Sequence, residues 1–405
     1  MSSKLKIALV SAFPPGKQSL NEYGLHLANG LAARDDVAEV VVIADILPAA
    51  AAELNLGPKI RIERVWRFNA LSAAPAMLTA LLREKVDGVI WNLQIASFGD
   101  REVPAALGLM APALARFCRI PSGVIAHNLV AGVDLEETHL KGQPIRQRIV
   151  QFGGAVVTRA LLNANYLTVT LRSYADNLRK NFPNKPVHLV PHGTFDVSVK
   201  DTMPLNERSK RIVTMGKFGT YKRLETLIAA FESISQESEY ADYELVIGGT
   251  DHPNTPGYMA ELAQRHSANP KIKFHGYVAE DDVPEFFADA RLSVFDYSAT
   301  TGSSGVLHQT VSYGTMPVFP YIGDFVDVCS DEGITGFNYS PDDAQSMAQA
   351  IETALSDLSV AQEMADANRA AAMDMPFSDV VDFHMRQLAQ IKNERPIHKS
   401  APASA

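Results

Sequence analysis

The sequence has little cysteine, no long apolar run and no excess of positive charge. Only Cys118 and Cys329 occur in 405 residues, far apart and without metal-ligand spacing, which fits a reducing compartment and gives no indication of a disulfide scaffold. The net charge of −9 argues against general nucleic-acid binding but leaves room for a local phosphate site. No run reaches the roughly 18 apolar residues of a membrane span, and the apolar start before Pro14 is too short for a signal peptide. We therefore expect a cytoplasmic protein.

The first half of the chain alternates short apolar strands with segments of helical periodicity. Helices are expected at Tyr23–Leu31 and Pro75–Lys85, and Val103–Phe117, although interrupted by Pro112, predicts a buried helix. Such alternation predicts a parallel sheet wrapped by helices, in which ligands sit beyond the carboxyl ends of the strands. The expected strands are Ile7–Val10, Glu39–Ala44, Ile60–Val65, Gly88–Trp91, Ser122–Ala126, Leu167–Val169 and Val187–Val190.

The segment Arg211–Phe231 predicts a strand, a polar loop and a helix. The strand should end at Gly216, and three cations, Lys217, Lys222 and Arg223, lie at the junction with the helix. Positive side chains disfavour a helix N-terminus, so they make sense if an anion shares the free N–H groups with them. For an isolated segment, a solvated loop with surface lysines is the alternative. Further strands at Tyr243–Ile247, closed by Gly248-Gly249, Ile272–His275 and Leu292–Phe295 predict a second parallel α/β domain.

The stretch GKFGTYKRLETLI resembles the segment that opens the second domain of the retaining, nucleotide-sugar-dependent glycosyltransferases of group 1, or family 4. Lys217 falls where that family has Arg, Lys222 matches its Lys, and Arg223 replaces the usual Gly. The resemblance implies that Lys217 and Lys222, beside Gly216, grip the donor diphosphate. Lys in place of Arg keeps the charge but loses the planar two-pronged contact.

Two segments of the first half resemble parts of the same family. FPPGKQSLNEYG is poor in glycine compared with a dinucleotide fingerprint and resembles the family's first loop, where Gln18 and Ser19 could donate hydrogen bonds to the donor phosphates. An ordinary helix N-terminus, capped by Ser19 with Glu22 three residues on, is compatible with that role. GVIAHNLV places His127 directly after a strand. A lone histidine is usually structural, but the family commonly has His here, reaching toward the transferred sugar.

HGYVAEDDV resembles the family's base-recognition region. Its backbone around Gly276, Tyr277 and Val278 would hold the nucleobase, and backbone contacts leave the identity of the base unreadable.

The stretch DYSATTGSSGVLHQTVSYGTMPV departs from the family. The two motif glutamates, eight positions apart, are replaced by Thr301 and Gln309. What survives is the loop Gly302-Ser303-Ser304-Gly305 before a helix, which presents N–H groups and hydroxyls to a phosphate. Gln309 could still hydrogen-bond a ribose hydroxyl, and Thr301 could contact the sugar without carrying charge.

The resemblance therefore implies a set of candidate site residues and no metal ligands. The catalytic candidates are His127, Lys217 and Lys222, and the donor-binding candidates are Gln18, Ser19, Gly216, Tyr277, Val278, Thr301, Gly302, Ser303, Ser304, Gly305 and Gln309.

Residues 141–159 form a basic amphipathic segment. Lys141, Arg146, Arg148 and Arg159 are set among apolar residues such as Phe152 and Val156. A helix pair packing on the sheet is the commoner reason for this pattern. The other is a peripheral contact with an anionic membrane surface, which would suit a lipid-linked acceptor.

Together these observations predict an α/β fold of two Rossmann-like parallel-sheet domains facing a cleft, the GT-B arrangement. The expected boundaries are 1–195 for the acceptor-side domain, with helix 377–392 packing back on it, 196–210 for a linker, 211–376 for the nucleotide-sugar domain and 393–405 for a disordered tail.

The expected function is transfer of a sugar, with retention, from a nucleoside diphosphate sugar to an acceptor hydroxyl in polysaccharide, glycolipid or glycoconjugate biosynthesis. The acceptor would be a carbohydrate or lipid-linked molecule, with no cofactor, metal or nucleic acid involved. The enzyme would act in the cytoplasm or at the inner face of the membrane. Because both motif glutamates are missing, a non-catalytic GT-B partner protein is the main alternative. A nucleotide-sugar 2-epimerase, which needs carboxylate acid and base groups, is disfavoured by the same loss.

Overall fold

The computed structural model describes residues 4–16, 18–47, 54–128, 144–197, 202–300 and 302–394, without the side chains of 144–151. Thr301, Lys141, linker residues 198–201 and tail residues 395–405, which carry sequence-based predictions, lie outside the described residues, as do the side chains of Arg146 and Arg148. The chain divides into two compact units, one of residues 1–190 with 378–405 and the other of residues 191–377. Each unit is described separately.

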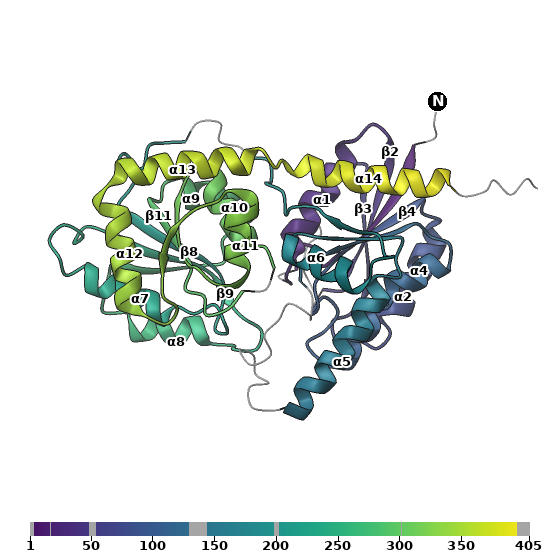
Figure 1. The fold of residues 1–405 in the computed structure, drawn as a ribbon. Coiled ribbons are helices and arrows are strands. Elements are labelled where there is room, and N and C mark those ends of the chain that lie inside the picture. The colour runs from purple at the N-terminus through teal and green to yellow at the C-terminus, as the bar shows by residue number, and fades with distance from the viewer. Residues whose placement is uncertain are drawn as a thin grey trace, which may run out of the picture. The chain divides into compact units, whose positions relative to one another are not determined.

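The first unit contains a parallel sheet in the order β3-β2-β1-β4-β5-β6-β7 (Figure 1). Its strands are β1 Leu5–Val10, β2 Val37–Asp45, β3 Ile60–Trp66, β4 Gly88–Leu93, β5 Ser122–Ala126, β6 Tyr166–Val169 and β7 Val187–Leu189. Its helices are α1 Asn21–Ala33, α2 Ala73–Glu84, α3 Glu102–Leu109, α4 Ala111–Phe117, α5 Pro144–Leu161, α6 Arg172–Asn181 and α14 Phe377–Asn393. Strands β4, β5 and β6 are buried along their whole length, as expected for parallel strands covered on both faces.

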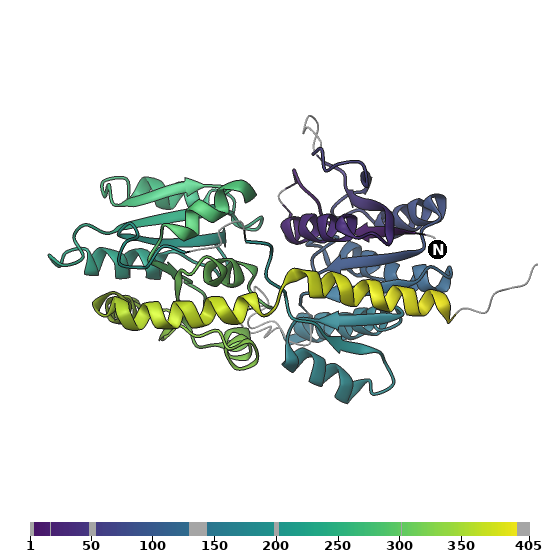
Figure 2. The same ribbon diagram turned by 90° about the horizontal axis from the view of Figure 1, so that it is seen from above.

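Helix α14, from the end of the chain, lies along this sheet (Figures 1 and 2). Leu388 of α14 packs closely on Gly88 of β4, since a Cβ on this glycine would lie only 3.0 Å from Cδ2 of the leucine. His384 Nδ1 lies 2.9 Å from the hydroxyl of Tyr166 on β6. At the end of the helix, Lys392 pairs with Asp87 at 2.7 Å. The last helix is therefore an integral part of the first unit.

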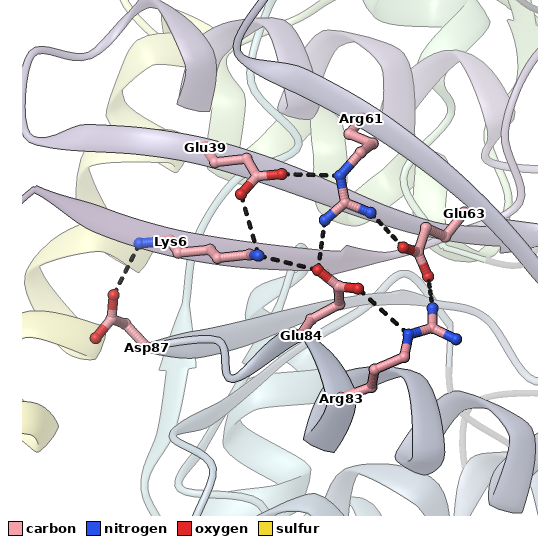
Figure 3. Close-up of polar contacts among 7 residues, drawn as sticks. All are labelled: Lys6, Glu39, Arg61, Glu63, Arg83, Glu84 and Asp87. Atoms are coloured by element: carbon pink, nitrogen blue, oxygen red, sulfur yellow. Dashed lines mark hydrogen bonds and ion pairs between the residues drawn. The ribbon is translucent and has the colours of Figure 1, made fainter.

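An ion-pair network joins β1, β2, β3 and α2 across the edge where the strands begin (Figure 3). Lys6 Nζ lies 3.1 Å from Glu39 and 2.9 Å from Glu84. Arg61 bonds the same two carboxylates and also Glu63. Lys6, followed by Arg61, holds the pKa of Glu84 down to about 2. Four elements are thus tied together by alternating charges at the edge opposite the carboxyl ends of the strands.

The second unit contains a parallel sheet in the order β10-β9-β8-β11-β12-β13. Its strands are β8 Arg211–Phe218, β9 Glu244–Asp251, β10 Ile272–Gly276, β11 Leu292–Val294, β12 Met316–Pro320 and β13 Phe337–Tyr339. Its helices are α7 Glu225–Ile234, α8 Tyr258–Arg265, α9 Val283–Ala288, α10 Gly305–Ser312, α11 Gly323–Glu332, α12 Ala344–Ser356 and α13 Leu358–Met373, with a 3-10 turn at Glu280–Asp282. The apolar faces of α7 and α12 close one core over β8, β9 and β11.

Each sheet reverses its strand order at one point, between β1 and β4 in the first unit and between β8 and β11 in the second. Ligands in open parallel sheets bind beyond the carboxyl ends of the strands at such points. The loops that follow β1, β4, β8 and β11 are therefore the expected ligand-binding loops.

The predicted end of the β8 strand at Gly216 is wrong. The strand continues to Phe218, and Gly216 pairs with Gly249 on β9, which was also predicted to end earlier. Gly249 has φ +140°, and a Cβ there would lie 2.0 Å from the carbonyl oxygen of Gly216. Glycine is therefore required at position 249, where a side chain would clash with the neighbouring strand and break the ladder.

The single buried helix predicted for Val103–Phe117 is also wrong. The segment forms two helices, α3 and α4, and Pro112 lies in the first turn of the second. Proline is tolerated there but not within a helix. Leu109, Ala111 and Ala115 are buried, but Val103 and Phe117 are 61% and 86% exposed, so burial explains only part of the apolar character of the segment. In the part of the chain that the structure describes, no helix is long and apolar enough to cross a membrane.

Candidate functional site

A pocket of about 100 Å³ opens beyond the carboxyl ends of β8 and β11. Two segments that were predicted from the sequence to bind phosphate line this pocket. They are Lys222, in the loop after β8, and the Gly302–Gly305 loop before α10. The other lining residues are Tyr221, Tyr297, Thr300, Val306, Asp324, Phe325 and Val328.

Lys222 is held in the pocket between two tyrosines. Its backbone forms an isolated antiparallel bridge with Tyr297. Its Nζ lies 4.6 Å from the ring centroid of Tyr297 and 5.8 Å from that of Tyr221, within the range of cation–π attraction. Burial by itself lowers the pKa of Lys222, but the neighbouring Tyr297 and Tyr221 outweigh it, so the pKa is raised. The side chain therefore supplies a fixed positive charge.

At the N-terminus of α7, two N–H groups that the sequence suggested for an external anion are taken by a carboxylate of the chain itself. Asp296, two residues after β11, accepts hydrogen bonds from the N–H groups of Thr226 at 3.0 Å and Leu227 at 3.1 Å. Arg223, the third cation of the junction, pairs with Asp342. The chain thus supplies its own carboxylate to this helix end, and Lys222 is left to act at the neighbouring pocket.

Lys217 lies at the end of β8 and is partly buried, and it is not among the residues that line the pocket. Burial, followed by the positive charges of Lys217 and Lys222, lowers the pKa of His252 in the loop after β9. Both lysines therefore act on one point at the carboxyl edge of the sheet. A Cβ on Gly216 would lie 3.6 Å from Cδ of Lys222, an ordinary contact, so a side chain of alanine size would fit beside this lysine.

The Gly302–Gly305 loop leads directly into α10. Ser304 is the N-cap, and its Oγ accepts from the N–H of Leu307 at 3.4 Å. The next N–H groups, of Gly305 and Val306, belong to the first helical turn, which has no partner within the helix. One carboxylate also lines the pocket: Asp324 accepts from the N–H of Gly302, and its own N–H donates to Thr300 Oγ1 at 2.7 Å. Asp324 of α11 therefore holds the start of the Gly302–Gly305 loop in place.

Tyr277, Val278 and Gln309, the remaining donor-site candidates among the described residues of this unit, are not part of the pocket lining. Tyr277 follows β10 at the edge of the sheet and is 42% exposed. Val278 is buried in a cluster with Phe286, and its Cγ2 fills the space beside Gly248, where a Cβ would lie 2.6 Å from it. Gln309 is partly buried on α10. Within the described residues, no three His, Cys, Asp or Glu side chains are grouped as metal ligands.

In the first unit, His127 is buried at the end of β5 and oriented by Asn92 of β4. His127 Nε2 is 2.7 Å from Asn92 Oδ1, and Asn92 Nδ2 donates to Ser11 Oγ at 2.9 Å. Because the amide oxygen can only accept, the neutral ring carries its proton on Nε2. The ring of Tyr23 packs edge-on at 4.4 Å. The sequence analysis missed Asn92, although a polar residue immediately after a predicted apolar strand is a recognisable signal.

Gln18 and Ser19 lie in the loop between β1 and α1, partly buried and exposed respectively. The predicted capping of α1 by Ser19 is wrong. The N-cap is Leu20, in a left-handed conformation with φ +69°, and no side chain caps the helix. The loop is instead fixed at its start, where Arg64 donates to the carbonyl of Pro14 at 2.6 Å. Ser19 therefore has no structural role at that helix end.

Solved structures of the same architecture show the fold. Sucrose-phosphate synthase from Thermosynechococcus elongatus superposes with a TM-score of 0.71 at 18% identity, covering 96% of this chain and 98% of that one. HepE from Anabaena, solved in complex with UDP-glucose, has a TM-score of 0.66 at 16% identity over 96% and 100% of the two chains. The fold is GT-B, and the predicted fold class of two parallel-sheet units is confirmed.

The second unit matches a known family model. Residues 209–357 match the family model described as glycosyl transferases group 1, so this segment is a group 1 glycosyltransferase domain, as its resemblance implied. A mannosylfructose-phosphate synthase of Agrobacterium fabrum (strain C58 / ATCC 33970) is 27% identical over 123 residues. That match spans 27% of this chain and 27% of the relative.

Proposed function

We propose that this glycosyltransferase moves a sugar from a nucleoside diphosphate sugar to an acceptor hydroxyl, with retention of configuration. The observation that carries the proposal is the pocket of the second unit, in which a fixed ammonium, two serine residues and a helix N-terminus meet. Each of these groups favours an anion, and together they suit the oxygens of a diphosphate.

The likeness to structures solved with such ligands supports the choice of donor. HepE from Anabaena was solved with UDP, with UDP and glucose, and with UDP-glucose. An Escherichia coli structure of the same fold, titled trehalose-6-phosphate, was bound with UDP-2-fluoro glucose. UDP and UDP-glucose are therefore the first probes to use with this chain.

The chemistry assigned to the pocket is stabilisation of the leaving group. As the bond between the anomeric carbon and the phosphate oxygen breaks, negative charge grows on the diphosphate. Preorganised cations and donors stabilise that charge more in the transition state than in the bound substrate. In this proposal Lys222 and the Gly302–Gly305 loop supply most of the stabilisation, with Lys217 adding positive charge from the strand end. His127 keeps its proposed role of contacting the transferred sugar.

The acceptor is proposed to be a carbohydrate or a lipid-linked molecule of polysaccharide, glycolipid or glycoconjugate synthesis. One observation favours a peripheral contact with a membrane. Phe152 and Val156 of α5 are 74% and 43% exposed, and Arg159 follows on the same helical stripe. An apolar stripe ending in a cation fits the surface of an anionic bilayer.

A non-catalytic partner protein is the second candidate. It is favoured by the loss of both motif glutamates and by Asp324, whose carboxylate repels an anion entering the pocket. If Asp324 remains ionised, the cation and donors must outweigh it for phosphate to bind.

Titration calorimetry with UDP and UDP-glucose distinguishes the two candidates. An enzyme should bind UDP, and Lys222→Met should weaken binding while Lys210→Met, on an exposed lysine of the same unit, should not. Incubation of the protein with UDP-glucose and a panel of acceptors, followed by NMR of the anomeric proton, tests both transfer and retention. A folded protein that gives no heat with UDP, GDP or ADP would contradict the proposed function.

A further inference from the structure

A buried group of polar side chains lies directly behind the Gly302–Gly305 loop. His308 of α10 is 2% exposed, and its Nε2 lies 2.9 Å from Ser303 Oγ and 3.4 Å from Glu332 Oε2 at the end of α11. The ring of His192 stacks on His308 with a centroid distance of 4.8 Å and an interplanar angle of 6°. Ser303 itself lines the pocket. The contact between His308 and Ser303 therefore connects the buried group to the pocket.

The surroundings of the two ring nitrogens of His308 determine its tautomer. Its Nδ1 is buried without a hydrogen-bond partner among the described residues, whereas Nε2 faces two oxygen atoms. A proton on Nδ1 would leave a buried donor unsatisfied, which costs more than leaving an acceptor nitrogen unused. Burial, together with the neighbouring His192, lowers the pKa of His308 well below its ordinary value, so the ring is neutral. The single ring proton is therefore assigned to Nε2.

This assignment determines what the Ser303 hydroxyl can do. If Nε2–H donates to Ser303 Oγ, the serine oxygen is the acceptor of that bond, and its own hydrogen must point elsewhere. At 2.9 Å Ser303 Oγ is the acceptor of that bond, whereas Glu332 Oε2, at 3.4 Å, has no hydrogen-bond partner among the described residues. Because Ser303 lines the pocket, the direction left for its hydrogen includes the space next to Lys222.

We propose that His308 is a positioning residue for the donor phosphates: it holds Ser303 Oγ so that the serine hydroxyl donates into the pocket. The inference rests on the proposed function and adds to it a residue that touches no substrate. It also accounts for a histidine on the buried face of α10, between Leu307 and Gln309, where burial and stacking alone would be met by an apolar side chain.

The test is a double-mutant cycle on UDP binding, measured by calorimetry with the full chain. Ser303→Ala removes the donor and should weaken UDP by about 10- to 100-fold, as for a hydrogen bond to a charged group. His308→Leu leaves the hydroxyl free to rotate and should weaken UDP by about two- to tenfold. His308→Gln, whose amide N–H can reach the position of Nε2, should restore binding close to that of the wild type. In the Ser303→Ala background, His308→Leu should have no further effect.

Thermal unfolding of each variant separates positioning from general stability. Equal losses from His308→Leu with and without Ser303, or a His308→Gln variant as weak as His308→Leu at an unchanged Tm, would overturn the inference while leaving the proposed function intact. So would a Ser303→Ala variant that binds UDP as the wild type does. If the wild type binds none of UDP, GDP and ADP, the proposed function falls, and this inference falls with it.

Discussion

The amine of Lys222 lies 4.6 Å from the ring centroid of Tyr297, and the same two residues also pair through their backbones. The ammonium is thus fixed before any ligand arrives, which lowers the entropy lost on binding. Lys222→Met keeps the apolar stem between the tyrosines and removes the charge. We expect about 10- to 100-fold weaker UDP binding, because a hydrogen bond to a charged group contributes roughly 1.5–3 kcal/mol.

Kinetics with a turnover assay add a second measurement for Lys222. The variant should both raise the KM for the nucleotide sugar and lower kcat, because the charge on the leaving group grows toward the transition state. Lys222→Arg, which preserves the charge, should keep part of the activity. Unchanged kinetics in Lys222→Met, with Lys210→Met as the matched control, would remove the proposed phosphate contact.

The carboxyl of Glu332 should make UDP binding depend on pH. Burial, followed by the charge of Asp331, raises the pKa of Glu332 to about 8. Above that pH the carboxylate competes with Ser303 for the Nε2–H of His308, so UDP affinity should fall between about pH 7.5 and 9. His192 stacks on the same ring, and Cys329, whose thiol pKa is raised to about 11 mainly by burial, stays neutral in this range.

Glu332→Gln provides the comparison, since the amide has no charge to gain. Its UDP affinity should be flat over the same pH range, and identical profiles for the two proteins would contradict the competition. The stability of the two proteins should diverge at lower pH, between about 4.5 and 8. A carboxyl with a raised folded-state pKa loses stability as pH rises from its unfolded value of about 4.5 toward 8. Glu332→Gln should therefore gain stability relative to the wild type at pH 9 compared with pH 5.

The sequence predicts the strands of both sheets because their apolar runs are local. Strands β4 and β5 were recognised from four and five consecutive residues, and burial on both faces explains why they lack alternation. Lys222 was found for a similar reason, since a cation between a strand and a helix stands out in the chain. The predictions that failed depend on partners distant in sequence. Asp296 reaches the N–H group of Thr226 across 70 positions, and no local pattern shows that it fills that helix end.

The group formed by Ser303, His308 and Glu332 is likewise only partly visible in the local sequence. Helical periodicity places His308 on one face of α10, but only the packing of α11 brings Glu332 to it. The extension of β8 past Gly216 likewise depends on which residue of β9 lies opposite. A side chain that follows a predicted strand directly, as Asn92 and Asp296 do, is the one signal that would have found some of these residues in advance.

The network around Glu84 predicts a pH-dependent contribution to stability. Its folded-state pKa of about 2 lies below the ordinary value of 4.5, so the stabilisation is present above about pH 5 and is lost as pH falls toward 2. Glu84→Gln should destabilise the protein by about 1–3 kcal/mol at pH 7, less than the pKa shift alone implies because the network is partly exposed. Chemical denaturation at pH 7 and pH 3 should show the difference shrinking, and exposed Glu102→Gln should show little effect at either pH.

The contact between Asn92 and His127 lies in the first unit, so it can be disturbed without altering the pocket of the second unit. Asn92→Ala leaves the buried Nε2–H of His127 without its acceptor at 2.7 Å, which should cost about 1–3 kcal/mol of stability. If His127 contacts the transferred sugar, the variant should lower kcat while UDP affinity stays unchanged, because the pocket of the second unit is intact. Asn92→Asp, which keeps an acceptor, should retain more activity than Asn92→Ala. A loss of UDP binding in Asn92→Ala would contradict this division of roles.

The exposed stripe of α5 gives a direct test of membrane contact. Phe152 and Val156 should insert into the interface of an anionic bilayer, and Arg159 should approach its phosphates. Wild-type protein should sediment with vesicles containing phosphatidylglycerol and remain in solution with phosphatidylcholine alone. Phe152→Asp with Val156→Asp should lower vesicle binding by at least about tenfold, because each exposed apolar side chain contributes on the order of 1 kcal/mol or more when buried. Val360→Asp, at a similarly exposed apolar residue of α13, is the matched control. Wild-type protein that stays in solution with anionic vesicles at low salt would rule out this surface, since screening is weakest there.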